Sequence, residues 1–318
     1  MTQAPDMSPA TIRAVAAPAG SPSDADEPQP LRAAMWMLGA IVSFSSMAVA
    51  GRAVSSTLDT FEIMTWRSLL GIVLVLGVST LAGTRRQIRA RRMGLHLARN
   101  LSHFTGQNLW FYAVAVIPLA QVFAVEFSSP LWVVLLSPLV LGERLTAMRL
   151  ATALAGFVGI LIVARPAVGG VDPGLAAAAL AAVGFAGSAV FTRLLTRTET
   201  ITSILFWLTV MQAAFGLVCA GIDGDIAMPA GPAVPWLGLI GCAGLVAHLC
   251  LTKALSLAPA AVVIPFDFLR LPAIAVVGAL VYGEAIDALT WVGAAVIFGA
   301  NYLNVVGEGR ARRAQARG

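Results

Sequence analysis

Residues 118–143 read PLAQVFAVEFSSPLWVVLLSPLVLGE, and residues 259–284 read PAAVVIPFDFLRLPAIAVVGALVYGE. The two stretches lie 141 positions apart and share eight of their 26 residues without a gap. Each is an apolar run with one acidic residue inside it, Glu126 in the first and Asp267 in the second, and each ends in Gly-Glu. We interpret them as the same helix of a repeated membrane unit.

The same offset of 141 relates positions well outside these two stretches. The matched pairs are Arg52 and Arg193, Ile63 and Ile204, Trp66 and Trp207, and Ala113 and Ala254. Chance similarity between apolar segments is the alternative. Matches at Trp, Arg, Pro and Gly-Glu positions under a single offset argue against it.

The composition is that of a membrane protein. Of the 318 residues, 58% are hydrophobic and 12% are charged, against about 45–50% and about 25% in an average globular domain. Ten apolar runs are each long enough to cross a bilayer or nearly so. They predict an all-α integral membrane protein with ten transmembrane helices at 33–54, 61–83, 95–117, 119–142, 148–165, 173–195, 201–222, 234–256, 259–282 and 287–306.

Each unit contains five of these runs, so the second unit must enter the membrane from the opposite side. We therefore expect two inverted five-helix repeats, 32–172 and 173–307. Residues 1–31 have few large apolar side chains and no apolar region typical of a cleavable signal, so they predict a disordered cytoplasmic tail. Residues 308–318 form a basic cytoplasmic tail.

Loop charges predict the orientation. Four of the 21 basic residues, Arg67, Arg99, Lys253 and Arg270, lie inside the apolar runs and away from their ends. With a cytoplasmic N-terminus, fifteen of the other seventeen lie on the inner side, many of them between residues 85 and 92. Basic loops stay cytoplasmic, so we expect a multi-pass protein of the cytoplasmic (inner) membrane with both termini inside.

Glu126 and Asp267 are the acidic residues that lie well inside apolar runs. A carboxylate at that depth costs several kcal/mol and needs a partner, a proton or water, so such residues are functional candidates. Both are candidates for proton coupling or substrate contact. The structural alternatives are an ion pair from Glu126 to Arg67 and a local pair from Asp267 to Arg270, three residues later.

Arg270 lies near the middle of its run and cannot shed its charge, and its guanidinium suits a carboxylate or phosphate. It is a candidate for binding an anionic part of the substrate, with neutralisation by Asp267 as the alternative. The other candidates for substrate contact or coupling are Arg67, His103, Trp110, Tyr112, Phe127 and Phe268. Cavity lining, lipid contact and packing remain open for the aromatic residues, and proton relay and helix–helix hydrogen bonding remain open for His103.

Several function classes lack their sequence signals. The net charge of +5 is spread over short loops rather than a basic groove, which argues against nucleic-acid binding. The chain has no phosphate-binding loop, no H-E-x-x-H and no G-x-S-x-G, and its three histidines are scattered. We therefore expect no enzyme activity, no cofactor and no metal. An integral membrane enzyme and a structural membrane subunit remain the alternatives to a transporter.

Short motifs carry a family resemblance across residues 32–306. They are Phe111-Tyr112-Ala113, Ile117-Pro118-Leu119-Ala120, Ser129-Pro130-Leu131, Leu141-Gly142-Glu143-Arg144, Ala258-Pro259-Ala260, Tyr282-Gly283-Glu284 and Trp291-Val292-Gly293-Ala294. Together they resemble the EamA-type unit of the drug/metabolite transporter superfamily.

The resemblance implies ten helices in two inverted repeats, a central cavity, and secondary transport of small organic metabolites such as amino acids or related compounds by alternating access. It also implies that the two Gly-Glu pairs are structural helix ends, and it marks Arg270 as a departure from the family pattern. We expect the cavity between the runs 95–117, 119–142, 234–256 and 259–282, with the bilayer and protons as further partners. The sequence leaves open the solute, the direction, the coupling ion and the oligomeric state.

Overall fold

The computed structural model describes residues 30–141, 146–164, 172–222, 224, 226–257, 266, 269–285 and 287–315. Every regular element within these ranges is helical, which confirms the all-α class. A short 3-10 turn, η1 (Arg85–Gln87), connects α3 to α4. The helices are α2 (Pro30–Val54), α3 (Thr60–Leu81), α4 (Met93–Val116), α5 (Leu119–Glu126), α6 (Ser129–Leu141), α7 (Ala147–Ala164), α8 (Pro173–Leu195), α9 (Ile201–Ala220), α10 (Ala233–Leu257), α12 (Arg270–Tyr282) and α13 (Ala288–Gln315).

A shift of 141 residues carries the helices of the first half of the chain onto those of the second. The bounds of α6 become those of α12, and the starts of α3 and α4 fall within one residue of the starts of α9 and α10. The sequence repeat is therefore a repeat of structure.

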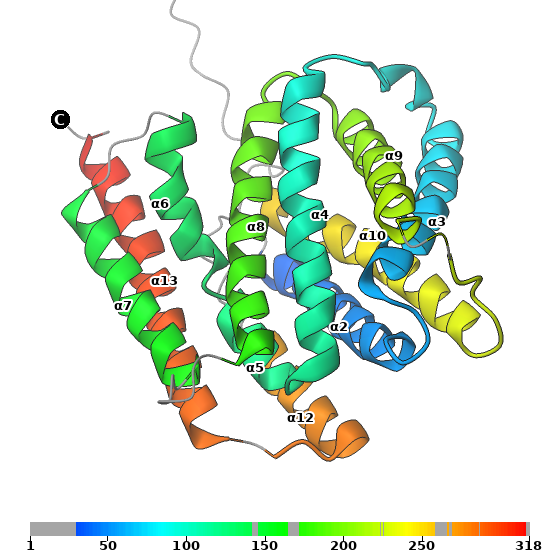
Figure 1. Cartoon of the computed structure of the whole chain (residues 1–318). Coiled ribbons are helices and arrows are strands. Elements are labelled where there is room, and N and C mark those ends of the chain that lie inside the picture. Colours follow the sequence, from blue (N-terminus) through cyan, green and yellow to red (C-terminus); the bar gives the residue numbers. More distant parts are fainter. Residues whose placement is uncertain are drawn as a thin grey trace, which may run out of the picture.

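The two repeats pack through helix pairs that a two-fold axis would exchange. α2 packs along α10 and α4 along α8, so the first helix of each repeat meets the third helix of the other. Equivalent helices also meet, α3 with α9 and α7 with α13 (Figure 1).

The direction of these equivalent helices shows that the repeats are inverted. A Cβ built on Gly216 of α9 would meet Thr65 of α3, while one on Gly71 of α3 would meet Thr209 of α9. Residue numbers that rise on one helix thus fall on the other, so α3 and α9 are antiparallel. Only an axis perpendicular to the helices relates equivalent helices in this way, and that is the inverted arrangement.

The predicted run 119–142 forms two helices, α5 and α6, and residues 119–136 together remain apolar enough to cross a membrane. α5 ends at Glu126 and α6 begins at Ser129, with a turn at Phe127 and Ser128. Pro130 lies in the first turn of α6, where its missing N–H costs nothing. The break therefore comes just before Pro130.

The ends of the chain also differ from the predicted boundaries. α2 begins at Pro30, and residues 1–29 of the predicted tail lie outside the described residues. α13 runs on to Gln315, so most of the predicted C-terminal tail 308–318 continues the last helix.

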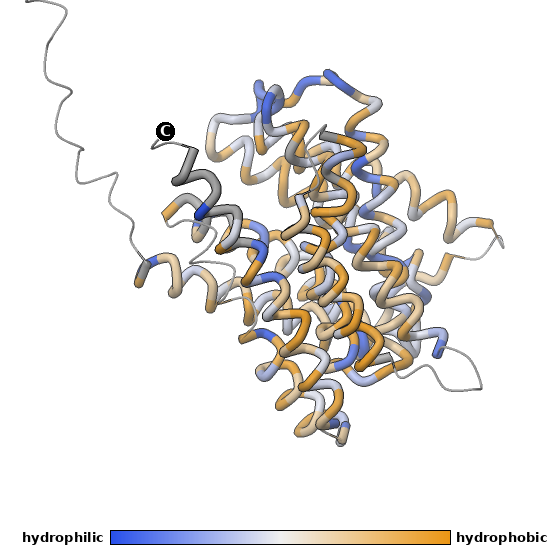
Figure 2. The backbone as a smooth tube through the Cα atoms, turned by 90° about the vertical axis from the view of Figure 1, so that its left-hand side faces the viewer, coloured by the Kyte–Doolittle hydropathy of each residue, from blue (hydrophilic) through white to orange (hydrophobic). Residues whose placement is uncertain are grey.

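The surface of the bundle is apolar over most of the helix length. Among the described residues, six helical segments are long and apolar enough to cross a membrane, and 150–163 and 270–282 are shorter apolar helices. Large side chains such as Leu81, Leu139 and Leu280 are more than 80% exposed, as expected for a lipid-facing surface. Figure 2 shows hydrophobic colour along most of the helices. The total of ten spans stays a prediction.

The two ends of the bundle differ in charge. The connection between α3 and α4, which contains the basic residues between positions 85 and 92, lies at the same end of the bundle as the C-terminal end of α13, at the top of Figure 1. We call this the basic end. The connection between α12 and α13 lies at the opposite end, which we call the distal end.

Close contact between the repeats depends on glycine where α4 crosses α8. A Cβ on Gly184 would lie 2.7 Å from the Cα of Gly106 and 2.9 Å from the carbonyl oxygen of Ser102. Backbone atoms cannot move aside as a flexible side chain can, so the crossing requires a small residue.

We expect Gly184→Ala to destabilise the protein by about 1–3 kcal/mol, because it overpacks this crossing. Gly77→Ala on α3 is the control, since nothing lies within 4 Å of a Cβ there. The unfolding temperature of both variants is measured in detergent. Equal unfolding temperatures would show that the crossing is not tightly packed.

Candidate functional site

Glu126, at the end of α5, is held by one residue from each repeat. Its Oε2 accepts a hydrogen bond from the indole Nε1 of Trp110 on α4 at 2.7 Å. Its Oε1 accepts one from the guanidinium Nη2 of Arg270 on α12 at 3.2 Å. The side chains of Glu126 and Arg270 are 15% and 6% exposed, so this is a mostly buried ion pair that joins the two repeats.

Three phenyl rings surround the Arg270 guanidinium. Its Cζ lies 4.8 Å from the ring centroid of Phe44 and 5.0 Å from those of Phe123 and Phe127. A cation over an aromatic face is stabilised by the ring quadrupole, more strongly where water is excluded. Arg270, Glu126, Trp110 and these three rings form what we call the charged aromatic site.

Arg270 is also the first residue of α12, and this position disfavours a cation. The helix dipole places positive partial charge at an N-terminus. Glu126 and the three rings must offset that cost. Arg270 is thus held against its local helix preference by contacts from the other repeat.

The structure pairs Glu126 with Arg270 and not with Arg67, which was the alternative the sequence offered. Arg67, on α3, has a buried Nη1 with no hydrogen-bond partner. The reason lies in the tertiary packing: α5 packs against α12, whereas Arg67 faces α10, where a Cβ on Gly244 would lie 4.0 Å from its Nη2. Asp267 and Phe268 lie outside the described residues.

The other described candidate residues do not all lie at one place. Trp110 and Phe127 belong to the charged aromatic site. His103 is 8% exposed, packs on Phe185 of α8 and interacts electrostatically with Arg67. Tyr112 is 42% exposed and therefore does not belong to the buried site.

Sequence reasoning did not select Phe44. This residue contacts both Arg270 and His248, with its ring 5.7 Å from the imidazole. A signal was present, because Phe44 and Phe185 are a further identity at the offset of 141. Phe185 packs on His103 at 5.8 Å. In each repeat, this phenylalanine on the first helix contacts a histidine on the third helix of the other repeat.

A second ion pair joins the repeats at the distal end. Arg52 at the end of α2 bonds to Glu284 beyond α12, and it also donates to the carbonyl oxygens of Val114 and Ile117 at the end of α4. The backbone N–H of Leu119, at the start of α5, donates to Glu284 Oε2 at 2.9 Å. We call the contacts of Arg52 and Glu284 the distal latch, since they tie four helix ends together.

The Gly-Glu motif explains how Glu284 reaches Arg52. Gly283 ends α12 with φ of +65°, a left-handed conformation that glycine adopts without the penalty of a Cβ. The chain then turns back, and the N–H of Glu284 donates to the carbonyl oxygen of Gly278 at 3.1 Å. Tyr282 adds a hydrogen bond to the carbonyl oxygen of Val49 at 3.1 Å. The motif is thus structural, as the resemblance implied for this pair.

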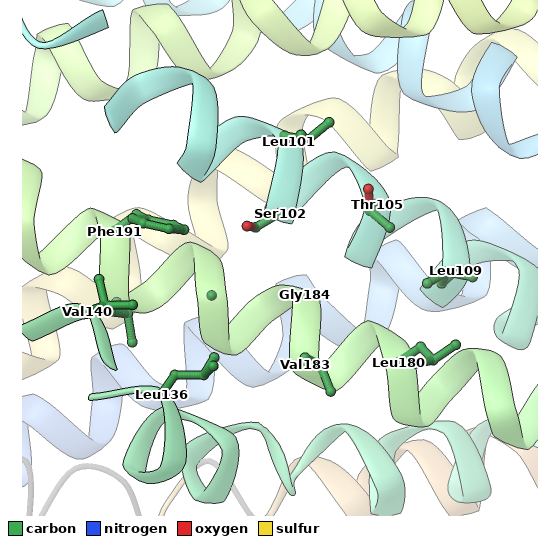
Figure 3. Close-up of a pocket in the computed structure, with 12 residues that line it drawn as sticks. Leu101, Ser102, Thr105, Leu109, Leu136, Val140, Leu180, Val183, Gly184 and Phe191 are labelled. Carbon is green, nitrogen blue, oxygen red and sulfur yellow. The ribbon is translucent and has the colours of Figure 1, made fainter. Parts of the chain in front are cut away.

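An apolar cavity of about 520 Å³ lies elsewhere, between α4, α6 and α8 (Figure 3). Ser102 and Thr105 are its polar members, and the rest of its lining is mainly leucine and valine. Leu101 and Leu180 are 56% and 57% exposed, so the cavity opens toward the lipid-facing surface. None of the described candidate residues lines it, which separates it from the charged aromatic site.

Two inverted helical repeats joined by buried ion pairs define an integral membrane protein of the class that includes secondary transporters. Comparison with known proteins gives the family. Residues 31–165 and 172–306 each match the model of the EamA-like transporter family. The chain belongs to this family.

Named relatives differ in what they carry. The chain is 35% identical over 254 residues to a riboflavin transporter of Brucella anthropi, covering 78% of this chain and 89% of that protein. It is 25% identical over 276 residues to an S-adenosylmethionine uptake transporter of Rickettsia felis, covering 87% and 93%. A crystal structure matches the fold with a TM-score of 0.60 at 21% identity, covering 88% of this chain and 98% of the other.

We expect Glu126→Leu and Arg270→Leu each to destabilise the protein by about 3–5 kcal/mol, because each leaves a buried charge without its partner. The double variant should lose clearly less than the sum, by about 1 kcal/mol or more of coupling. Chemical unfolding in detergent measures the free energy of unfolding of each variant in this double-mutant cycle, with the exposed Arg86→Leu on η1 as the control. Strictly additive losses would mean that the pair is not coupled.

Proposed function

We propose that this chain is a secondary active transporter that moves a small organic metabolite across the cytoplasmic membrane by alternating access. The observation that carries this proposal is the buried ion pair between Glu126 and Arg270, since it joins the two inverted repeats at an aromatic site. Ionisable residues inside a membrane bundle mark substrate or ion pathways. A structural protein would gain as much from an apolar contact.

The two repeats would move against each other during transport. Both the charged aromatic site and the distal latch cross the boundary between them, so both must change when the repeats rock. With both termini cytoplasmic, as the loop charges favour, the distal latch closes the outer side.

Glu126 and Arg270 take complementary roles in this mechanism. Glu126 binds a proton or a cationic group, and Arg270 binds an anionic group of the solute. Protonation of Glu126 removes the countercharge of Arg270, which frees the guanidinium for the solute. Asp267, expected from the sequence to act with them, keeps the role of a second proton or substrate contact.

The named relatives narrow the range of candidate substrates. Riboflavin and S-adenosylmethionine are both larger than an amino acid and both carry a planar heterocycle, which the aromatic rings of the site would suit. We take riboflavin as the first candidate. The amino acids implied by the family resemblance remain among the solutes to be tested.

Riboflavin, S-adenosylmethionine, amino acids, nucleosides and carboxylates form the panel of solutes to be tested. Purified protein in liposomes should show saturable uptake of riboflavin or another member of this panel, measured with and without a pH gradient. Empty liposomes and liposomes with heat-denatured protein are the controls. A membrane enzyme or a structural subunit would give no saturable flux for any member, and that result would reject transport.

We expect Glu284→Ala to loosen the distal end without unfolding the bundle. The substitution removes the countercharge of Arg52 and the acceptor of the Leu119 N–H. Hydrogen exchange of the peptides around residues 117–123 and 279–285 should quicken about tenfold or more, while α7 and α13 stay protected. Arg86→Ala is the control at the basic end. Unchanged hydrogen exchange in Glu284→Ala would show that the distal latch does not stabilise the distal end.

A further inference from the structure

Several buried polar side chains make too few hydrogen bonds. Arg67 Nη1 on α3 and His103 Nε2 and Gln107 Nε2 on α4 are inaccessible to solvent and have no hydrogen-bond partner within the part of the chain that the structure describes. His103 and Gln107 are 8% and 4% exposed as whole residues. A buried donor without an acceptor costs about 1–3 kcal/mol, so native proteins keep few of them without a reason.

These groups lie around one place in the bundle. His103 interacts electrostatically with Arg67 and with His248 of α10, and Gln107 follows His103 by one turn on the same face of α4. A Cβ on Gly244, one turn before His248, would lie 4.0 Å from Arg67 Nη2 and 3.7 Å from the sulfur of Met47 on α2. Helices α2, α3, α4 and α10 therefore meet here. We call Arg67, His103, Gln107 and His248 the donor cluster.

Phe44 connects the donor cluster to the charged aromatic site. Its ring packs edge-on against His248 with centroids 5.7 Å apart, and it also lies 4.8 Å from the Arg270 guanidinium. The donor cluster is thus the polar side of the same interior region whose other side is aromatic.

The charge of the donor cluster is one-sided. Among the described residues, the charged side chains that act on His103 and His248 are Arg67 and Arg99, both cationic. The acidic group of the neighbouring site, Glu126, is already bonded to Arg270 and Trp110. Arg67 stays charged in any environment that a protein provides, and its planar group fits two adjacent acceptor atoms.

The donor cluster favours one chemical class of solute. A cation placed among these groups would be repelled in a medium of low dielectric. A neutral or anionic solute with adjacent carbonyl or ring-nitrogen acceptors would satisfy the unpaired donors, and a planar ring beside those acceptors would pack on Phe44.

We propose that Arg67, with His103 and Gln107, is the specificity subsite that binds the acceptor edge of a planar, non-cationic heterocycle. The inference rests on the proposed transport function and deepens it. Riboflavin has the required chemistry, since its ring system carries two carbonyl groups and no positive charge. S-adenosylmethionine carries a sulfonium and an ammonium group, and the donor cluster disfavours both.

The test measures binding and stability together on the full-length protein in detergent. Riboflavin binding is followed by quenching of its own fluorescence, and S-adenosylmethionine binding by competition and by equilibrium dialysis. Wild type should bind riboflavin more tightly than S-adenosylmethionine. Arg67→Met and Gln107→Leu should each weaken riboflavin binding roughly tenfold to a hundredfold, the loss expected for a hydrogen bond to a charged or buried group.

Stability without ligand separates recognition from a structural role. Arg67→Met removes a buried charge that has no hydrogen-bonding acceptor, so the ligand-free protein should unfold at the same temperature or higher. A structural arginine would instead lower the unfolding temperature. Arg86→Met on the exposed η1 is the matched control and should change neither quantity.

The outcomes distinguish the two proposals. If wild type transports solutes but prefers S-adenosylmethionine, or if Arg67→Met and Gln107→Leu bind riboflavin as wild type does, the subsite is wrong and transport stands. Loss of stability in Arg67→Met with unchanged relative affinities also overturns it, because buried water would then be the partner of these donors. No saturable flux for any panel member rejects the transport function itself.

Discussion

A charge inside a membrane bundle is costly without a partner, and for Arg270 and Arg52 in this chain the partner comes from the other repeat. Arg270 meets Glu126 and Arg52 meets Glu284, and both pairs cross the boundary between the two halves. Breaking either pair leaves a charge that is costly to keep in a dry interior. The halves are therefore held in one arrangement by a few strong contacts rather than by apolar packing alone, since apolar side chains gain little from leaving lipid.

The inverted repeat gives this arrangement its geometry. First helices meet third helices, and equivalent helices meet antiparallel, so one set of packing rules builds both sides of the interface. The match is not complete. α6 packs closely on α8, whereas its counterpart α12 lies more against α5 and has little contact with α2. A symmetric scaffold that is locally asymmetric is what alternating access requires, because the two states exchange the roles of the repeats.

Glycine and glutamate at the helix ends show how sequence, local structure and assembly connect. Gly283 permits the left-handed turn, the turn returns Glu284 toward α12, and Glu284 then reaches Arg52 of the first repeat. In the sequence, Arg52 is matched with Arg193 and Glu284 with Glu143, so one contact links two of the matched pairs. The side chains of Arg193 and Glu143 lie outside the described residues.

The sequence by itself determined the helical membrane class, the two repeats and their inversion, because helix length, apolar content and an odd number of spans per repeat are properties of the linear chain. It also marked Glu126 and Arg270 as candidates, since burying a charge is costly wherever the helix lies. Only the tertiary structure decided which charges pair. The sequence offered Arg67 as the partner of Glu126, and the packing of α5 on α12 instead placed Glu126 beside Arg270. The same packing brought in Phe44 and left Arg67 among histidines of α4 and α10, because contacts between distant segments depend on helix rotation and crossing, which sequence periodicity does not fix.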